Sequence, residues 1–235
     1  MYQAVFLDID NTLLSFTAAA QDAMRTGMAK LGRSYTDDIW PLFQRINNDL
    51  WQRLERGELT PQQLYRIRWG MIFDALGWQE DGPAFEELFR AGLHESAVPE
   101  PGALQLLAVL DALRPGVRIC AASNGPFEQQ RHRLELAGML HCFDHLFISE
   151  AVGFSKPDAR FFDHAFAVLN AGRAEEEMIR PESCLMIGDS LTADISGAAA
   201  YGIKTCWFDP ESKPCPGNIT PTFTVTALEE IAALL

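Results

Sequence analysis

The sequence lacks three features, and each absence excludes a class of protein. No run of about 18 consecutive apolar residues is present, so no membrane-spanning helix is predicted. No basic segment precedes the first apolar run at residues 4–7, so no secretory signal is indicated. No CxxC pair occurs among the five cysteines, and we expect buried free thiols at Cys120, Cys184 and Cys206, which lie in apolar runs. These absences predict a cytoplasmic protein with no membrane partner.

Positive charge is also scarce. The chain has 19 Lys and Arg residues against 32 Asp and Glu residues, which gives a formal net charge of −13 at pH 7. Such a surface repels a phosphate backbone, so the composition disfavours a nucleic acid polymer as partner. It leaves a small phosphorylated metabolite open, because a few local cations and backbone amides can bind one inside an acidic shell. The oligomeric state is not predicted by any feature of the sequence.

The composition is otherwise that of a soluble globular protein. The chain has 235 residues, of which 48% are hydrophobic and 22% are charged. Domains commonly contain about 100–150 residues, so the length fits one catalytic domain with an insert or two small domains.

Short apolar runs recur along the chain in the pattern of strands buried on both faces of a parallel sheet. The runs are residues 4–7, 117–122, 145–148, 184–187 and 204–208. Helical patterns lie between them at residues 103–113, 127–137, 159–169 and 193–201. This alternation predicts an α/β fold, with a Rossmann-like core made of a doubly wound parallel sheet.

One interval, residues 15–98, breaks this alternation. It has no convincing strand, and its apolar residues, such as Phe43, Ile46 and Leu50, follow helical spacing. Prolines and a glycine at 99–102 are typical of a connector between domains. We therefore expect a catalytic core formed by residues 1–14 and 99–235, with residues 15–98 inserted as a helical cap domain.

Polar residues follow the predicted strands, and ligands of doubly wound sheets bind beyond the carboxyl ends of the strands. Asp8 and Asp10 follow the first strand, and their spacing of two directs both side chains to one side if the extended backbone continues. Asp189 follows a later strand and supplies a third carboxylate. Because neighbouring carboxylates repel one another, a divalent cation would stabilise them, and an all-oxygen set suits Mg²⁺. Mn²⁺ accepts the same ligands and remains an alternative.

Each of these segments also has a purely structural interpretation. Asp10-Asn11-Thr12 is a common polar turn, and Ser123-Asn124-Gly125 or Gly188-Asp189-Ser190 can simply begin a helix. A lone lysine such as Lys156 is usually a solvated surface residue. The functional interpretation rests on their joint occurrence, because all of them follow separate strands and converge on one edge of the expected sheet.

Taken together and in this order, the segments resemble the four motifs of the haloacid dehalogenase-like hydrolase superfamily. The motif residues are Asp8-Ile9-Asp10-Asn11-Thr12, Ser123, Lys156, and Gly188-Asp189 with Asp194. The position of the insert, directly after the first motif, is similar to that of the helical cap in the first cap class of the superfamily. The resemblance covers nearly the whole chain.

The resemblance implies a role for each motif residue. Asp8 would attack phosphorus, and Asp10 would protonate the leaving oxygen and later deprotonate the hydrolytic water. Ser123 and Lys156 would hold the phosphoryl oxygens, and Asn124 and Gly125 would offer backbone N–H groups.

The same resemblance implies a metal site. Asp8, the backbone carbonyl of Asp10, and Asp189 would hold the metal, with Asp194 as a supporting carboxylate. The acid at Asp10 argues against the dehalogenases of the superfamily, which lack it, and against its transport ATPases, which carry Thr there. Phosphatases and sugar-phosphate mutases both keep the two aspartates, so these motifs leave both open.

The insert is the segment that would select the leaving group. Its segments 46–51, 57–60 and 66–69 resemble the cap of bacterial pyrimidine 5′-nucleotidases of the house-cleaning type. This implies a nucleoside 5′-monophosphate as substrate, with Asn47, Trp51, Trp69 and Arg68 as candidate contacts to the nucleoside. Aromatic residues at helical spacing are also the ordinary core of a bundle. A sugar-phosphate or phosphoglycolate phosphatase, a β-phosphoglucomutase-like phosphotransferase and a non-enzymatic phosphoryl-binding module remain as alternatives.

Overall fold

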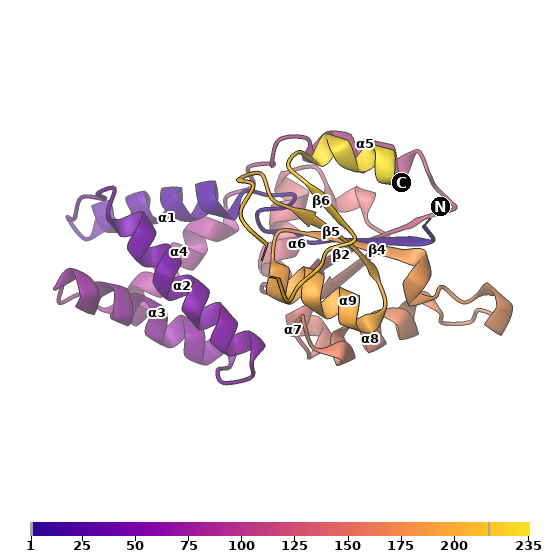
Figure 1. Ribbon diagram of the computed structural model, residues 1–235. Coiled ribbons are helices and arrows are strands. Elements are labelled where there is room, and N and C mark those ends of the chain that lie inside the picture. The colour runs from indigo at the N-terminus through magenta and orange to yellow at the C-terminus, as the bar shows by residue number, and fades with distance from the viewer. Residues whose placement is uncertain (1, 216) are drawn as a thin grey trace. The chain divides into compact units, whose positions relative to one another are not determined.

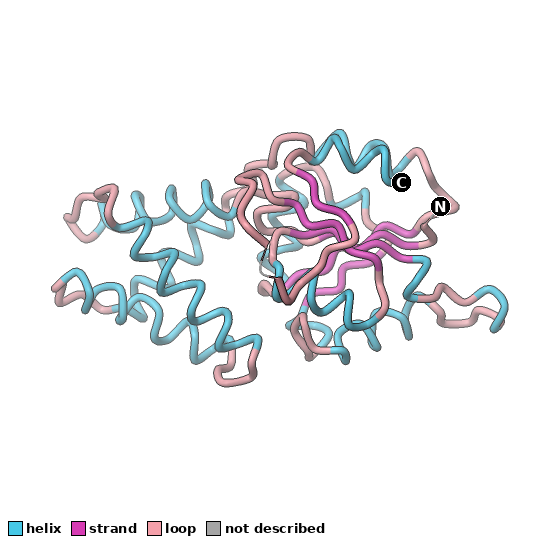
Figure 2. Tube along the Cα trace, viewed as in Figure 1, coloured by secondary structure: helices cyan, strands magenta, loops and turns pink. Residues whose placement is uncertain are grey.

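The computed structural model describes residues 2–215 and 217–235 (Figures 1 and 2). The chain divides into two compact units. The core unit consists of Met1–Ser15 and Ala97–Leu235, and the helical unit is Phe16–Ser96. Within the described ranges, no helix has both the length and the apolar character needed to cross a membrane.

A six-stranded sheet, parallel throughout, forms the centre of the core unit (Figure 2). Its strands, in the spatial order β3-β2-β1-β4-β5-β6, are β3 (His145–Ile148), β2 (Arg118–Ser123), β1 (Ala4–Leu7), β4 (Cys184–Gly188), β5 (Lys204–Phe208) and β6 (Phe223–Val225). The predicted doubly wound α/β fold is confirmed, and five of the strands lie where the apolar runs predict them. The sequence analysis missed β6, whose three residues are too short for a recognisable pattern.

Helices cover both faces of this sheet (Figure 1). The side chains of one face pack with α5 (Ala103–Asp111), α6 (Phe127–Leu136) and the 3₁₀ helix at Leu228–Leu234. Those of the other face pack with α7 (Ser149–Val152), α8 (Ala159–Leu169) and α9 (Gly197–Tyr201). Because the strands are buried on both faces, they appear in the sequence as continuous apolar runs. Cys120, Cys184 and Cys206 are buried and free, as expected from such runs.

Strand β1 lies where the strand order of the sheet reverses. It pairs with β2 on one side and with β4 on the other. The connection from β2 leads outward to β3, and the chain then returns to the opposite side of β1 to form β4. Such a reversal of strand order leaves a crevice at the carboxyl ends of the central strands, where ligands of open α/β sheets bind.

The helical unit contains four helices: α1 (Phe16–Lys30), α2 (Ile39–Glu55), α3 (Pro61–Leu76) and α4 (Gly82–His94). Helix α3 has a capping box, in which the Thr60 hydroxyl accepts from the Gln63 N–H while the Gln63 side chain accepts from the Thr60 N–H. It ends at Gly77, whose left-handed backbone (φ 69°) is readily adopted by glycine. These local signals fix where the helix begins and ends.

Aromatic residues dominate the interior of this unit. Trp69 is fully buried, with ring centroids 4.4 Å from Phe85 and 5.6 Å from Phe43. Helices α3 and α4 approach closely at Gly82, because a Cβ there would lie 2.4 Å from the backbone nitrogen of Gly70.

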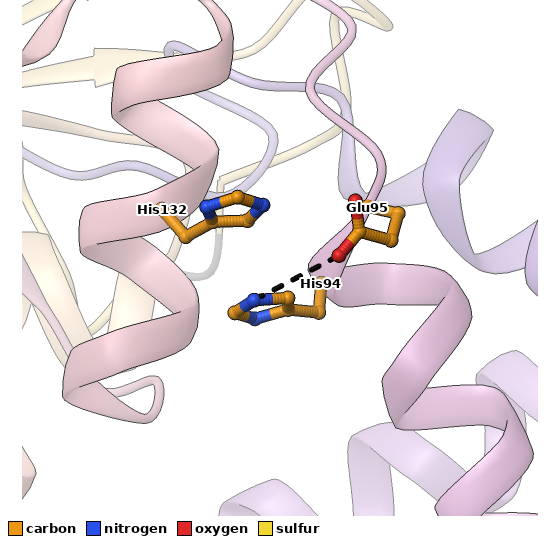
Figure 3. Close-up of side chains that lie close together, drawn as sticks. All are labelled: His94, Glu95 and His132. Carbon is orange, nitrogen blue, oxygen red and sulfur yellow. Dashed lines mark ion pairs between the residues drawn. The ribbon is translucent and has the colours of Figure 1, made fainter.

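Helix α4 ends at a pair of polar side chains, His94 and Glu95. Their Nε2 and Oε1 atoms lie 3.9 Å apart, and they form an ion pair when His94 is protonated (Figure 3). Figure 3 also labels His132, which lies on α6 of the core unit.

Candidate active site

The loop after β1 presents the first two carboxylates. Asn11 adopts a left-handed backbone (φ 56°), which asparagine tolerates better than most residues. The backbone N–H groups of Leu13 and Leu14 both donate to the Ile9 carbonyl at 2.9 Å, so the chain turns back directly after Asp10. This tight loop holds Asp8 and Asp10 at the carboxyl end of the central strand, as the sequence predicts.

Lys156 lies inside the site. It is 1% exposed, and its Nζ donates to Asp8 Oδ1 at 2.8 Å and to Asp194 Oδ1 at 2.6 Å. A third hydrogen bond goes to the Ala122 carbonyl at the end of β2. Burial alone would lower the pKa of Lys156, but the carboxylates of Asp194 and Asp8 outweigh it and raise this pKa above its usual value. The alternative of a solvated surface lysine is therefore wrong.

Asp194 is held by the turn that follows β4. Its Oδ2 accepts from the Ser190 N–H at 3.0 Å, and Ser190 caps the π-helical segment Leu191–Ser196 by accepting from the Ala193 N–H at 3.1 Å. Gly188 makes room for this arrangement, since a Cβ at that position would lie 2.2 Å from Asp194 Oδ2. The helix-cap interpretation is thus correct for Ser190, and the same turn also positions a carboxylate.

Three of the predicted metal residues form one cluster. Asp8, Asp189 and Asp194 each offer a carboxylate oxygen, and these oxygens all lie within 4.8 Å of one another. Burial raises the pKa of Asp8 to about 7; Lys156 opposes this rise, while Asp194 and Asp10 add to it. Burial also raises the pKa of Asp189, and the neighbouring Asp8 and Asp194 add to the effect. Without a bound cation, the surroundings of Asp8 and Asp189 therefore disfavour the negatively charged form of both carboxyl groups.

This donor set fits a hard divalent cation. All the side-chain donors are carboxylate oxygens, the ligands that Mg²⁺ prefers. Lys156 offsets one of the three negative charges, and a divalent cation would offset the other two. Asp189 is further steadied by its backbone, whose carbonyl accepts from the Trp207 indole N–H at 2.9 Å.

The segment after β2 ties the site together. The Asn124 side chain donates to the Lys156 carbonyl and accepts from the Lys156 N–H, both at 2.8 Å. This pair of hydrogen bonds fixes the backbone of Lys156, a role of Asn124 that the sequence analysis did not predict. Ser123 is 1% exposed, and its Oγ accepts from the Gly125 N–H at 3.1 Å.

Two residues of α6 complete the site, and the sequence analysis missed both. Gln130 and Arg133 are fully buried, and both donate to the carboxylate of Asp10 at 2.5 Å, to Oδ2 and Oδ1 respectively. Their spacing of three places them on one face of the helix. A polar pair at that spacing directly after Ser123-Asn124-Gly125 was the available signal, but polar helical residues are usually solvated.

The candidate nucleoside contacts lie in the helical unit. Arg68 is 2% exposed, and its guanidinium donates to both carboxylate oxygens of Glu86, at 2.6 and 3.1 Å, and to Asn47 Oδ1 at 2.8 Å. Asn47 is also buried, whereas Trp51 is half-buried against the aromatic interior. Arg68 and Asn47 thus have partners within the unit, and Trp69 is fully buried among its aromatic residues. The assignment of all four residues to substrate binding stays a prediction.

Comparison with known proteins is consistent with this geometry. A family model described as haloacid dehalogenase-like hydrolase matches residues 2–202. YfnB of Bacillus subtilis is 32% identical over 234 residues, which cover 100% of this chain and 95% of that protein. A solved structure of YfnB bound to magnesium matches with a TM-score of 0.89 at 31% identity, and covers 100% of this chain and 98% of that one.

Two further relatives have named activities. The pyrimidine 5′-nucleotidase YjjG of Escherichia coli is 33% identical, with 98% of this chain and 96% of that protein covered. The pyrimidine 5′-nucleotidase PynA of Streptococcus pneumoniae is 31% identical, with 98% and 93% covered.

Proposed function

The chain belongs to the haloacid dehalogenase-like hydrolase family, and we propose that it is a Mg²⁺-dependent phosphatase of nucleoside 5′-monophosphates that works through an aspartyl phosphate. Family membership and the phosphatase relatives make it a phosphoric monoester hydrolase. The observation that carries the proposed chemistry is the buried carboxylate of Asp8. It contacts Lys156 at 2.8 Å and lies in a cluster with Asp189 and Asp194.

The proposed reaction has two steps. An oxygen of Asp8 attacks phosphorus, the bond from phosphorus to the ester oxygen breaks, and Asp10 gives its proton to this departing oxygen, which leaves as a hydroxyl group. Asp10 then takes a proton from water, the water oxygen attacks the phosphorus of the aspartyl phosphate, and the Asp8 carboxylate leaves. Ser123 would donate a hydrogen bond to a phosphoryl oxygen. Lys156 would contribute positive charge, since its three ammonium hydrogens are directed at Asp8, Asp194 and the Ala122 carbonyl.

The metal would be held by Asp8, Asp189 and the backbone carbonyl of Asp10, with Asp194 supporting the site through Lys156 and Ser190. Bound Mg²⁺ supplies positive charge that stabilises phosphoryl oxygens. The magnesium-bound structure of YfnB supports this choice of metal. Mn²⁺ is the alternative that the same carboxylates would accept.

The substrate proposal rests on the helical unit and the relatives. YjjG and PynA are pyrimidine 5′-nucleotidases, and the similarity to each extends over 98% of this chain, including its helical unit. We therefore place a pyrimidine nucleoside 5′-monophosphate first among the small phosphorylated substrates. The cytoplasmic location that the cysteines and the N-terminal sequence favour stays a prediction.

A substrate panel tests the proposal. Purified protein with Mg²⁺ is assayed for phosphate release from nucleoside 5′-monophosphates, hexose phosphates and phosphoglycolate. We expect the highest kcat/KM with pyrimidine nucleotides. Preferential release from hexose phosphates or phosphoglycolate would contradict the nucleotidase assignment, and isomerised sugar phosphate without net phosphate release would indicate a mutase.

The nucleophile is tested by Asp8→Asn. We expect phosphate release to fall at least about 10⁴-fold, because the covalent step is removed. Asp111→Asn is the control, since Asp111 is exposed at the end of α5 and precedes the amino end of β2, whereas Asp8 lies at the carboxyl end of β1. Full activity of Asp8→Asn would exclude the aspartyl-phosphate route.

A further inference from the structure

Gln130 lies between two residues that the proposed reaction uses. Its Nε2 donates to Asp10 Oδ2 at 2.5 Å and to Ser123 Oγ at 2.9 Å. Its Oε1 accepts from Arg133 Nη1 at 3.0 Å, and the same Arg133 nitrogen donates to Asp10 Oδ1. Both hydrogens of the amide nitrogen and one lone pair of the amide oxygen are therefore engaged inside the core unit.

The orientation of this amide is determined by its neighbours. If Oε1 and Nε2 were exchanged, an oxygen would face the Asp10 carboxylate and an NH₂ group would face the Arg133 guanidinium. Both contacts would then be repulsive, because they pair acceptor with acceptor and donor with donor. Arg133 thus fixes the direction in which Gln130 presents its two hydrogens.

The Ser123 hydroxyl is constrained as a result. Its oxygen accepts from the Gly125 N–H and from Gln130 Nε2, which occupies both of its lone pairs. These two contacts use both lone pairs of Ser123 Oγ and leave its hydroxyl hydrogen available for a further hydrogen bond. Ser123 can therefore act toward a phosphoryl oxygen only as a donor, which is the role that a negatively charged group requires.

Gly125 is a second, independent indication that the position of Gln130 is built into the fold. A Cβ at residue 125 would lie 2.4 Å from Gln130 Nε2 and 2.9 Å from its Cδ. Contacts below 3.0 Å require one side to move, so a side chain at this position would shift either the Gln130 amide or the backbone of residue 125. The backbone after β2 thus leaves a space that the Gln130 side chain fills.

We propose that Gln130 and Arg133 are positioning residues that together hold the Asp10 carboxyl group and commit the Ser123 hydroxyl to donation. The proposal rests on the proposed function, because it assigns these partners to the acid/base and to a phosphoryl-binding group of that reaction. Each Asp10 oxygen receives one hydrogen bond from α6 and keeps a second acceptor site. The carboxyl group is thereby held in one orientation and can still exchange a proton with the leaving group or water.

The choice of leaving group distinguishes a positioning role of Gln130 and Arg133 from a merely structural role. Ester oxygens of nucleotides are poor leaving groups and need a proton from Asp10, whereas p-nitrophenolate leaves without one. Displacement of Asp10 should therefore slow the first step with a nucleotide far more than with p-nitrophenyl phosphate. It should also slow hydrolysis of the aspartyl phosphate, which needs Asp10 as a base with either substrate.

The experiment compares Gln130→Met and Arg133→Lys with wild-type protein by stopped-flow and steady-state kinetics. We expect kcat for the nucleotide to fall about 10²–10³-fold with KM within about threefold, consistent with loss of general acid–base catalysis. With p-nitrophenyl phosphate, we expect a burst of p-nitrophenolate with an amplitude near one per enzyme and a rate within about tenfold of wild type. Arg131→Met is the matched control on the same helix, because Arg131 pairs with Glu128 and Glu135 on the surface.

Two results would overturn the proposal. One is wild-type kinetics in both variants, and the other is an equal loss of the burst and of nucleotide turnover in variants that remain folded by circular dichroism. The double variant Asp10→Asn with Arg133→Lys provides a further check, because Arg133→Lys should cause no additional loss of kcat once Asp10 is replaced. Additive losses would show that Arg133 does not act through Asp10.

Failure of the substrate assignment gives a different result. If wild-type protein releases no phosphate from nucleotides, the nucleotidase proposal fails, and the burst comparison proceeds with an alkyl phosphate from the panel that is hydrolysed. If wild-type protein hydrolyses no ester, thermal unfolding of Asp10→Asn, Arg133→Lys and the double variant tests the contact itself. Non-additive shifts in Tm support the contact between Asp10 and Arg133, and additive shifts overturn it.

Discussion

At the scale of single residues, Lys156 determines the charge balance of the site. Its ammonium group lies between the carboxylates of Asp8 and Asp194, at 2.8 and 2.6 Å, and all three side chains are almost completely removed from solvent. Buried charges are tolerated only when they are paired, because each costs several kcal/mol to desolvate. The residue that would supply positive charge beside the phosphoryl group is thus also the cation that pairs two buried carboxylates of the core unit.

Replacement of this residue by Lys156→Met should be costly. It leaves two buried carboxylates without their cation, and we expect the free energy of unfolding to fall by about 3–5 kcal/mol. Urea unfolding measures the change. Added Mg²⁺ should recover part of the loss, because the metal would supply positive charge to Asp8.

Lys213→Met is the control for this measurement. Lys213 is exposed and pairs with Glu211 on the surface, so its loss should change the free energy of unfolding by less than about 1 kcal/mol. A similar small change in Lys156→Met would show that the buried ion pairs do not stabilise the protein.

The positions of several site residues could be predicted from the sequence alone. Asp8, Asp10, Ser123 and Asp189 lie at the ends of strands or in the following turns, as predicted from their order along the chain. Their convergence follows from the parallel sheet, which brings all carboxyl ends to one edge.

Lys156 differs, because helix α7 separates it from β3 and it lies in the turn before α8. The sequence around Lys156 gave no sign that this side chain is buried. Its chain neighbours Ser155 and Pro157 are equally compatible with a buried and a solvated lysine.

At the scale of elements, α6 illustrates how tertiary contacts assign a role to a helix. Its sequence predicts a helix over residues 127–137, and the structure has Phe127–Leu136. Gln130 and Arg133 are among its buried residues, although both are polar. Burial of such side chains requires partners. Asp10 provides one from the loop after β1, more than 100 positions away, and Ser123 provides another from the end of β2, seven positions before Gln130.

In the helical unit, a buried ion pair links α3 and α4. Arg68 of α3 binds both carboxylate oxygens of Glu86 of α4, and Asn47 of α2 accepts from the same guanidinium. Burial raises the pKa of Glu86, and Arg68 opposes that rise. This network fixes three helices relative to one another.

Arg68→Met should therefore destabilise the protein by about 3–5 kcal/mol, because Glu86 would remain buried without its cation. The double variant Arg68→Met with Glu86→Gln should recover part of this loss, since no buried charge remains. Chemical unfolding monitored by tryptophan fluorescence follows the helical unit, in which Trp69 is buried.

Arg33→Met is the matched control within the same unit. Arg33 pairs with Glu80 at 2.9 Å, but its side chain is 42% exposed, so we expect a loss of at most about 1 kcal/mol. If both arginine variants lose the same stability, burial of the pair with Glu86 has no energetic consequence. A change in KM with Arg68→Met at unchanged stability would instead favour direct contact with substrate.

At the scale of the whole molecule, metal binding at the carboxylate cluster would be coupled to stability. Asp8, Asp189 and Asp194 repel one another in the folded core unit and are separated in the unfolded chain. A cation that binds only the folded state stabilises it by RT ln(1 + [L]/Kd), which is about 2.7 kcal/mol at 100 times Kd. Folding and metal binding should therefore reinforce each other.

We expect saturating Mg²⁺ to raise the Tm of the core-unit transition by roughly 5–10 °C, given about 2–4 °C per kcal/mol for a protein of this size. Differential scanning calorimetry with Mg²⁺ or with EDTA measures the shift, and EDTA should also abolish phosphate release. Asp189→Asn should show little or no shift. An equal shift in Asp189→Asn would place the bound metal elsewhere.

The sequence by itself determined which segments form the strands of the sheet centre and which residues stand at their carboxyl ends. Continuous apolar runs, capping residues, and the Gly and Pro residues of turns and connectors are local signals. Each depends only on residues close to it in the sequence. Such signals also predicted a helical segment at residues 15–98, and the structure has helices α1 to α4 between Phe16 and His94. They could not reveal β6, whose three residues owe their conformation to pairing with β5.

Only the tertiary structure decided which polar side chains are buried together. Arg133 and Asp10 are 123 positions apart, Lys156 and Asp8 are 148 apart, and each contact exists only because the sheet brings distant segments to one edge. The physical reason is that desolvation depends on everything packed around a group, whereas the local sequence records only its chain neighbours. The Asp8–Asp10 pair was therefore visible in the sequence, but the partners that orient and balance it were not.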